Sequence, residues 1–196
     1  MWLWLLLSSL PTLAAEDKLL RRANRGDQEA VIEIYDRYFQ SIYRFVRNRV
    51  DDPQQAEDIT SEVFLKLVQS LGGTSAPQKS LRGWLFQVAR HEISRYVSQQ
   101  RQATHQPLEE WLPDDAQIDP EVLTAKLLER EQLQKLLKRL VPDQQEVLLL
   151  RFTEMLNLEE TAEAMNKSVS AVKSLQFRAI KNLQQLLAMS EEEGHA

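Results

Sequence analysis

The chain has 196 residues and a formal net charge of −5, and its 43% hydrophobic content is enough for one or two small domains with packed cores. It contains no cysteine, which excludes disulfides and thiolate metal sites, and its three histidines lie too far apart to have ligand spacing. No glycine-rich phosphate loop, nucleophile elbow or paired carboxylates in an apolar frame occur, so the sequence predicts a protein that is not an enzyme and holds no metal or cofactor.

The negative charge is unevenly distributed along the chain. Residues 16–102 carry 14 basic and 12 acidic side chains, and residues 132–187 carry eight basic and six acidic ones. Residues 103–131, by contrast, carry two basic and eight acidic side chains, and three consecutive glutamates follow at 191–193. Two mildly basic blocks therefore flank an acidic middle segment. This asymmetry predicts that the mildly basic blocks bind naked DNA with modest affinity. A larger assembly is then expected to supply the remaining affinity.

The first 15 residues are apolar, with the run Trp2-Leu3-Trp4-Leu5-Leu6-Leu7 at their centre. They are too short to span a membrane, which takes about 20 apolar residues. Three interpretations stay open: translation starts downstream of Met1, the segment anchors the protein at a membrane surface, or it packs against the protein. We favour the first, because no basic residue precedes the apolar run as in a secretory signal. A chain that starts near Glu16 is then expected to fold normally.

Helical periodicity dominates residues 16–102, which we expect to form a first domain. Asp27 is a plausible N-cap, and Pro53 suits the first turn of the helix that follows it. Helices are expected at 19–23, 30–50, 56–71 and 81–100, with a loop of helix-breaking residues at 72–77. The apolar positions that set these periods are Ala30, Ile34, Tyr35, Tyr38, Phe39, Ile42, Tyr43, Val46 and Val50, then Ile59, Val63, Phe64 and Leu67, then Trp84, Leu85, Val88, Ile93 and Val97.

The middle of the chain has no sustained period. Residues 103–120 contain three prolines and five of the acidic residues, which predicts a linker with little fixed structure. A helical pattern resumes at 121–140 and leads into the last block of the chain.

The stretch 142–187 predicts a helix-turn-helix. Its three helices are expected at 142–152, 158–165 and 170–187. Asn166 tolerates the left-handed conformation that ends a helix, and Ser168 or Ser170 can cap the next one. Val169, Val172, Ile180 and Leu183 recur at the spacing of a buried side.

The third of these helices has a basic outer side. Lys173, Gln176, Arg178 and Lys181 lie on it, and such side chains contact phosphates and base edges. An ordinary three-helix bundle with solvated Lys and Arg is the alternative. The small Ala162, the polar turn and the basic third helix together favour DNA binding.

With only five glycines and no strand-like alternation, the expected fold is all-α. It consists of two small helical domains joined by an acidic flexible linker, the C-terminal domain being the helix-turn-helix. The expected division is an apolar segment at 1–15, a first domain at 16–102, a linker at 103–120, a second domain at 121–187 and an acidic tail at 188–196.

Three stretches together resemble the extracytoplasmic-function (ECF) class of bacterial RNA polymerase sigma factors. The stretch AEDITSEVFL (56–65) resembles the polymerase-docking helix, and LRGWLFQVAR (81–90) resembles the approach to the promoter-melting helix. Residues 140–179 resemble the domain that binds the −35-type promoter element. The resemblance covers nearly all of 19–187, and the order and spacing of the stretches are more specific than any one of them.

The resemblance implies a non-catalytic cytoplasmic protein that directs RNA polymerase core to promoter DNA, and anti-sigma factors are the partners expected for such proteins. It implies that Glu57, Asp58 and Glu62 dock on the clamp of the β′ subunit. Charge complementing the helix dipole is the other interpretation of these acids. The linker would thread the channels of the polymerase, or it is a plain solvated spacer.

For DNA, the resemblance implies two sets of contacts. The residues expected to hold the melted strand are Arg82, Trp84, Arg90, His91 and Arg95. Those expected to contact the upstream element are Lys173, Ser174, Gln176, Arg178 and Lys181. Core packing is the favoured interpretation of Trp84 and Phe86, because their spacing fits an inner face.

Two departures from the family pattern stand out. The stretch HEISRYVSQQR (91–101) lacks the polar Asn and the dense basic run that are usual there, which weakens the expected backbone contact. Leu175 occupies a place where Arg is common, so the promoter preference is expected to be unusual. Two other functions fit the residues: a helix-turn-helix regulator that acts without docking, and a membrane-associated adaptor anchored by 1–15. The docking-like helix favours the sigma factor.

Overall fold

The computed structural model describes residues 13–77, 80–103, 136–137 and 139–193. Within these ranges the regular elements are all helical: α2 (Leu13–Asn24), α3 (Gln28–Arg47), α4 (Pro53–Ser70), α5 (Leu81–Ala103), α7 (Pro142–Leu148), the π-helix η1 (Leu149–Thr153), α8 (Leu158–Ala164) and α9 (Val169–Glu193). The predicted all-α class is confirmed. The predicted linker and most of the helix expected at 121–140 lie outside the described residues.

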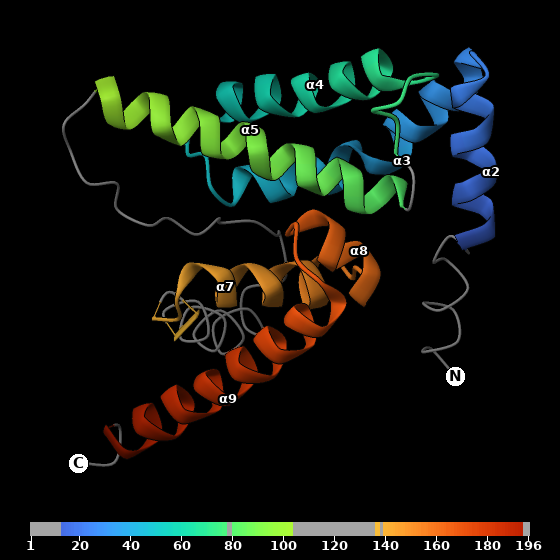
Figure 1. Cartoon of the computed structure of the whole chain (residues 1–196). Helices are drawn as coiled ribbons and strands as arrows, with labels where there is room; N and C mark the ends of the chain where they lie inside the picture. Colours follow the sequence, from blue (N-terminus) through green and yellow to red (C-terminus); the bar gives the residue numbers. More distant parts are fainter. Residues whose placement is uncertain (1–12, 78–79, 104–135, 138, 194–196) are drawn as a thin grey trace, which may run out of the picture.

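The helices form two groups. In Figure 1, α2 to α5 pack together, and α7 to α9 form a second group that meets the first where α8 lies beside α5. Buried apolar side chains of both groups belong to one continuous cluster. The two groups are called the first and second domain below.

Local capping signals set the boundaries of the first domain's helices, as the sequence predicted. The Asp27 side chain accepts a hydrogen bond from the Ala30 backbone N–H at 3.2 Å at the start of α3. Asp52 does the same for Gln54 at 2.9 Å, and Pro53 takes the first helical position of α4. The expected core residues Ile59, Val63, Phe64 and Leu67 are all buried.

One core residue of α3 was not on the predicted inner face. Phe45 is fully buried and meets Phe86 of α5 edge-on, with ring centroids 5.1 Å apart. The burial of Phe86 confirms that this residue packs in the core. Tyr35, expected inside, is instead 42% exposed at the surface of α3.

Helix α2 begins earlier than the sequence predicted. It starts at Leu13 rather than Leu19, so the first turn lies within the segment that was set apart as 1–15. Glu16 is buried, and its carboxylate accepts a hydrogen bond from the Tyr38 hydroxyl at 2.5 Å. This contact joins α2 to the middle of α3. Burial raises the pKa of the Glu16 carboxyl, although the Tyr38 hydroxyl acts in the opposite direction.

The helix expected at 142–152 is regular only as far as Leu148. It continues as the π-helix η1, whose wider turn carries Arg151 toward α9. Arg151 Nε donates to Gln176 Oε1 at 3.0 Å, and its guanidinium also donates to the Leu156 carbonyl. These bonds join η1 to α9 and to the loop before α8.

The turn of the helix-turn-helix is confirmed in detail. Asn166 has φ of 51°, the left-handed conformation expected of it, and the Ser168 hydroxyl accepts a hydrogen bond from the Ala171 N–H at 3.2 Å. Helix α8 begins with a capping box in which Asn157 and Glu160 bond each other's backbone N–H. Helix α9 runs to Glu193, so the residues expected as a separate tail from 188 continue the helix.

Candidate nucleic-acid and polymerase interfaces

One side of α9 presents the basic face that the sequence predicted. Lys173, Ser174, Arg178 and Lys181 are all exposed, and Ser174, Arg178 and Lys181 follow one another at intervals of four and three residues. Phe177 stands among them, 70% exposed. The opposite side of the helix is occupied by Val172 and Ala179, which are fully buried. The core therefore leaves this face free to meet a partner.

Two residues of α9 differ from their neighbours on that face. Gln176 is half-buried and holds Arg151, so its amide oxygen points back to η1 rather than outward. Leu175, which replaces the family's common Arg, is 7% exposed and belongs to the core cluster. Its apolar character thus fits its position.

The acids expected to dock on polymerase lie along α4. Glu57 and Asp58 are exposed and Glu62 is half-buried. Asp58, Glu62 and Leu65 are spaced at i, i+4 and i+7, which places them on one side of the helix. Leu65 is 49% exposed, so the acidic stripe runs directly into exposed apolar surface.

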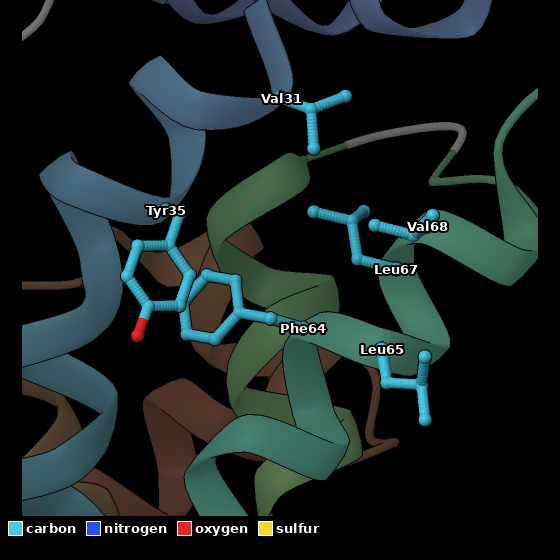
Figure 2. A pocket seen from close by; sticks show the side chains of 6 residues that line it. All are labelled: Val31, Tyr35, Phe64, Leu65, Leu67 and Val68. Carbon is cyan, nitrogen blue, oxygen red and sulfur yellow. The ribbon is translucent and has the colours of Figure 1, made fainter. Parts of the chain in front are cut away.

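That apolar surface continues into a groove between α3 and α4 (Figure 2). It is lined by Val31, Tyr35, Phe64, Leu65, Leu67 and Val68. Tyr35 and Phe64 meet edge-on, with ring centroids 5.0 Å apart. The acids of α4 were predicted from the sequence as docking residues, but Tyr35 was expected inside, and nothing in the periodicity indicated that it lines this groove.

The residues expected to hold melted DNA divide into two sets on α5. Arg82 and Arg90 face the second domain: Arg82 donates to the carbonyls of Glu154 and Met155, and Arg90 Nε donates to Glu146 Oε2 at 3.0 Å. His91 and Arg95, further along the helix, are exposed. The structure therefore does not bring the five residues together on one surface.

Trp84 and Glu92 complete the description of α5. Trp84 is half-buried and packs against the core cluster. The carboxylate of Glu92 is buried and lies 2.7 Å from Arg95 Nη2 and 3.1 Å from Lys66 Nζ of α4. Lys66 also lies 3.7 Å from Glu62, so ion pairs link the acidic face of α4 to the exposed end of α5. Sequence reasoning gave Glu92 no role.

Comparisons with known proteins identify the family of the chain. A model described as Sigma-70 region 2 matches residues 34–103, and one described as Sigma-70, region 4 matches residues 136–185. The chain is 33% identical over 171 residues to the ECF RNA polymerase sigma factor BldN of Streptomyces coelicolor, covering 87% of this chain and 65% of BldN. It is 30% identical over 165 residues to the ECF RNA polymerase sigma factor SigX of Bacillus subtilis, covering 82% of this chain and 84% of SigX.

A solved structure shares the fold. The sigma factor RpoE in complex with the anti-sigma factor NepR from Bartonella quintana superimposes with a TM-score of 0.61 at 22% identity, covering 80% of this chain and 95% of that one. Among the described residues of this chain, no helix is long and apolar enough to cross a membrane. From the match to both regions and the identity to SigX over most of its length, the chain belongs to the family of ECF RNA polymerase sigma factors.

Proposed function

We propose that the chain is a non-catalytic cytoplasmic sigma factor that docks on RNA polymerase core and directs initiation to specific promoters. The observation that carries the proposal is the pairing, within one chain of this family, of two exposed faces. One is the acidic and apolar face of α4, and the other is the basic face of α9. The proposed domain division is 16–102 for docking and melting, and 121–187 for the upstream element.

Docking is assigned to α4. Glu57, Asp58 and Glu62 supply negative charge, which would steer the helix to a basic surface on the β′ clamp. Leu65 and Val68, about half exposed, add apolar area that becomes buried in the complex. An exposed apolar patch bordered by charge is typical of a protein–protein interface.

Promoter recognition is assigned to α9. Lys173, Ser174, Arg178 and Lys181 would enter the major groove, where Lys and Arg read guanine and neutralise phosphates. Gln176, held by Arg151, would contribute by fixing the orientation of the helix. The exposed Phe177 has the character of a side chain that contacts a thymine methyl group.

Strand opening is assigned to α5. His91 and Arg95 are exposed and suited to contact an unpaired strand, and the half-buried Trp84 lies on the same helix. Because the structure of RpoE was solved with an anti-sigma factor, we also propose a protein of that type as a partner of this chain.

The decisive experiment is run-off transcription with purified core polymerase on genomic fragments, starting with the protein's own promoter. Specific transcripts are expected only when the protein is added. If the protein binds promoter fragments alone but never binds core, it is a helix-turn-helix regulator instead. Absence of both activities would overturn the proposal.

Charge reversal tests the docking surface directly. The double variant Asp58→Arg and Glu62→Arg should bind core at least about tenfold more weakly, because like charges across the interface repel. Asp17→Arg, on an exposed position of α2, is the matched control and should bind core as the unmodified chain does. Thermal unfolding should change little in either protein, since exposed substitutions usually stay within about 0.5 kcal/mol.

A further inference from the structure

The outward side of α2 is basic. Lys18, Arg21 and Arg25 are all exposed and follow one another at intervals of three and four residues, so they lie on one side of the helix and of the turn that continues it. The opposite side carries Leu19 and Ala23, which are buried in the core cluster. We call the three exposed cations the basic stripe.

The basic stripe is not neutralised by neighbouring side chains. Arg22 lies 2.7 Å from Asp27, but none of the three stripe cations forms an ion pair with another described residue. Of the two acids within α2, Glu16 is buried and Asp17 is exposed. The stripe therefore presents net positive charge on the outside of the molecule.

An uncharged apolar stretch directly precedes α2. Residues 1–15 contain no charged side chain, and Trp2 to Leu7 is an unbroken run of Trp and Leu, called the apolar run below. The chain between Leu7 and the start of α2 at Leu13 spans at most about 20 Å when extended. The apolar run and the basic stripe can therefore reach one and the same surface.

We propose that the chain binds the surface of an anionic lipid bilayer through these two elements together. The apolar run enters the boundary between the headgroups and the acyl chains, and the basic stripe lies on the anionic headgroups. Of the three interpretations of the first 15 residues, the basic stripe thus favours the membrane-surface anchor. The inference goes beyond the proposed function and does not rest on it.

Each element supplies what the other lacks. Trp and Leu side chains suit the headgroup level, where the ring of an indole is in an apolar environment while its N–H stays hydrated. Each Lys or Arg close to an anionic surface strengthens binding about fivefold. A single weak anchor gives only marginal association, so two signals are needed for a stable one.

The place of α2 in the fold leaves its basic side open. In Figure 1, α2 stands at one end of the group formed by α3, α4 and α5, and it packs against α3 and α5. The acids proposed to dock on polymerase lie on α4, and the cations proposed to read the upstream element lie on α9. The lipid surface is thus assigned to a helix that neither of these proposed interactions uses.

Co-sedimentation of the full chain with vesicles tests the proposal. Vesicles of phosphatidylcholine with about one-third phosphatidylglycerol should pellet the protein at about 0.05 M salt and release most of it at about 0.5 M, because salt screens the attraction. Pure phosphatidylcholine vesicles should bind at least about tenfold more weakly. Equal binding to both compositions would overturn the proposal, and so would pelleting without vesicles, which indicates self-association.

Substitutions on α2 test the basic stripe. Arg21→Gln should weaken binding to the anionic vesicles about fivefold, and Asp17→Arg should strengthen it at least as much, because it replaces the exposed acid by a further cation. Arg139→Gln is the matched control, since it removes the same charge from an exposed position before α7 and should bind as the unmodified chain does. Equal losses from Arg21→Gln and Arg139→Gln would show that overall charge, and not the stripe, attracts the vesicles.

Truncation tests the apolar run. A chain that starts at Leu13 keeps the basic stripe and should bind the anionic vesicles at least about tenfold more weakly. Unchanged binding by this chain would overturn the proposal.

Tryptophan fluorescence locates the apolar run. Lipids with brominated acyl chains should quench part of the fluorescence of the unmodified chain, and they should quench little in the double variant Trp2→Phe and Trp4→Phe, which keeps the run apolar. Equal quenching of the two proteins would mean that the run lies elsewhere, for instance in the groove between α3 and α4 (Figure 2), and the proposal would fail. A native N-terminus that begins after Trp4, measured by mass spectrometry, would equally overturn it. None of these measurements uses polymerase or promoter DNA, so their outcome is independent of run-off transcription.

Discussion

At the scale of single residues, Glu16 is a buried carboxylate with a pH-dependent effect on stability. Burial raises its pKa in the folded protein above the ordinary value of a glutamate carboxyl. The folded state therefore favours the protonated form. The stability contributed by Glu16 is complete below the unfolded pKa and is lost as the pH rises through the folded pKa.

The substitution Glu16→Gln should remove this pH dependence. A glutamine can still accept the hydrogen bond from Tyr38, and it carries no charge to desolvate. The variant should therefore be more stable than the unmodified chain at pH 7, by up to about 1 kcal/mol, and equal to it near pH 4. Urea unfolding at pH 4 to 8 measures the difference. Asp17→Asn, on the exposed neighbour, serves as control, and a difference that shrinks as the pH rises would contradict the prediction.

The exposed cations of α9 give a second prediction at this scale. Lys173→Ala and Arg178→Ala should each weaken promoter binding by the complex with core, by about 1–3 kcal/mol if the residue reads a base. A residue that contacts only phosphate would weaken all sequences alike and lower the salt dependence. Arg21→Ala, exposed on α2, should leave promoter binding unchanged. Normal binding by the folded double variant would remove these residues from the interface.

At the scale of elements, the capping box of α8 should matter more than the short length of that helix suggests. Asn157 accepts a hydrogen bond from the Glu160 N–H at 2.8 Å, and Glu160 accepts one from the Asn157 N–H at 2.6 Å. Asn157→Ala should cost about 0.5–2 kcal/mol of unfolding free energy. Glu159→Ala, exposed in the same first turn, should stay within about 0.5 kcal/mol. Equal losses in urea unfolding would show that the box is not the cause.

The elements that the sequence predicted well are those whose boundaries are set by residues close to them in the chain. Asp27, Pro53 and Asn166 each act within a few residues, and the apolar period of α4 gave its buried face directly. The π-helix η1 was missed because an apolar run at 149–153 fits a regular helix equally well. The start of α2 was missed because the apolar residues before Glu16 were set apart as a separate segment, and only the Glu16–Tyr38 contact shows how the first turns are held.

At the scale of the whole molecule, the candidate interfaces were only partly predictable. The outer face of α9 follows from its period, so Lys173 and Arg178 could be named without a structure. The pairing of Arg44 with Glu154 joins residues 110 positions apart, and no spacing rule connects them. The same holds for Arg82 and Arg90: their sequence context suggested DNA, and only the arrangement of the two domains shows that carboxylates and carbonyls already hold them.

Truncation at the N-terminus measures how much the first helix contributes to the whole domain. A chain that starts at Leu13 keeps α2 complete, whereas one that starts at Lys18 loses its first turn and Glu16. The shorter chain leaves the Tyr38 hydroxyl buried without its acceptor, which costs about 1–3 kcal/mol. We therefore expect the start at Lys18 to destabilise the unmodified chain clearly. In a chain that already carries Tyr38→Phe, the same truncation should cost only the lost helix packing. If the chains that start at Leu13 and at Lys18 unfold at the same urea concentration, α2 is held by contacts other than the Glu16–Tyr38 bond.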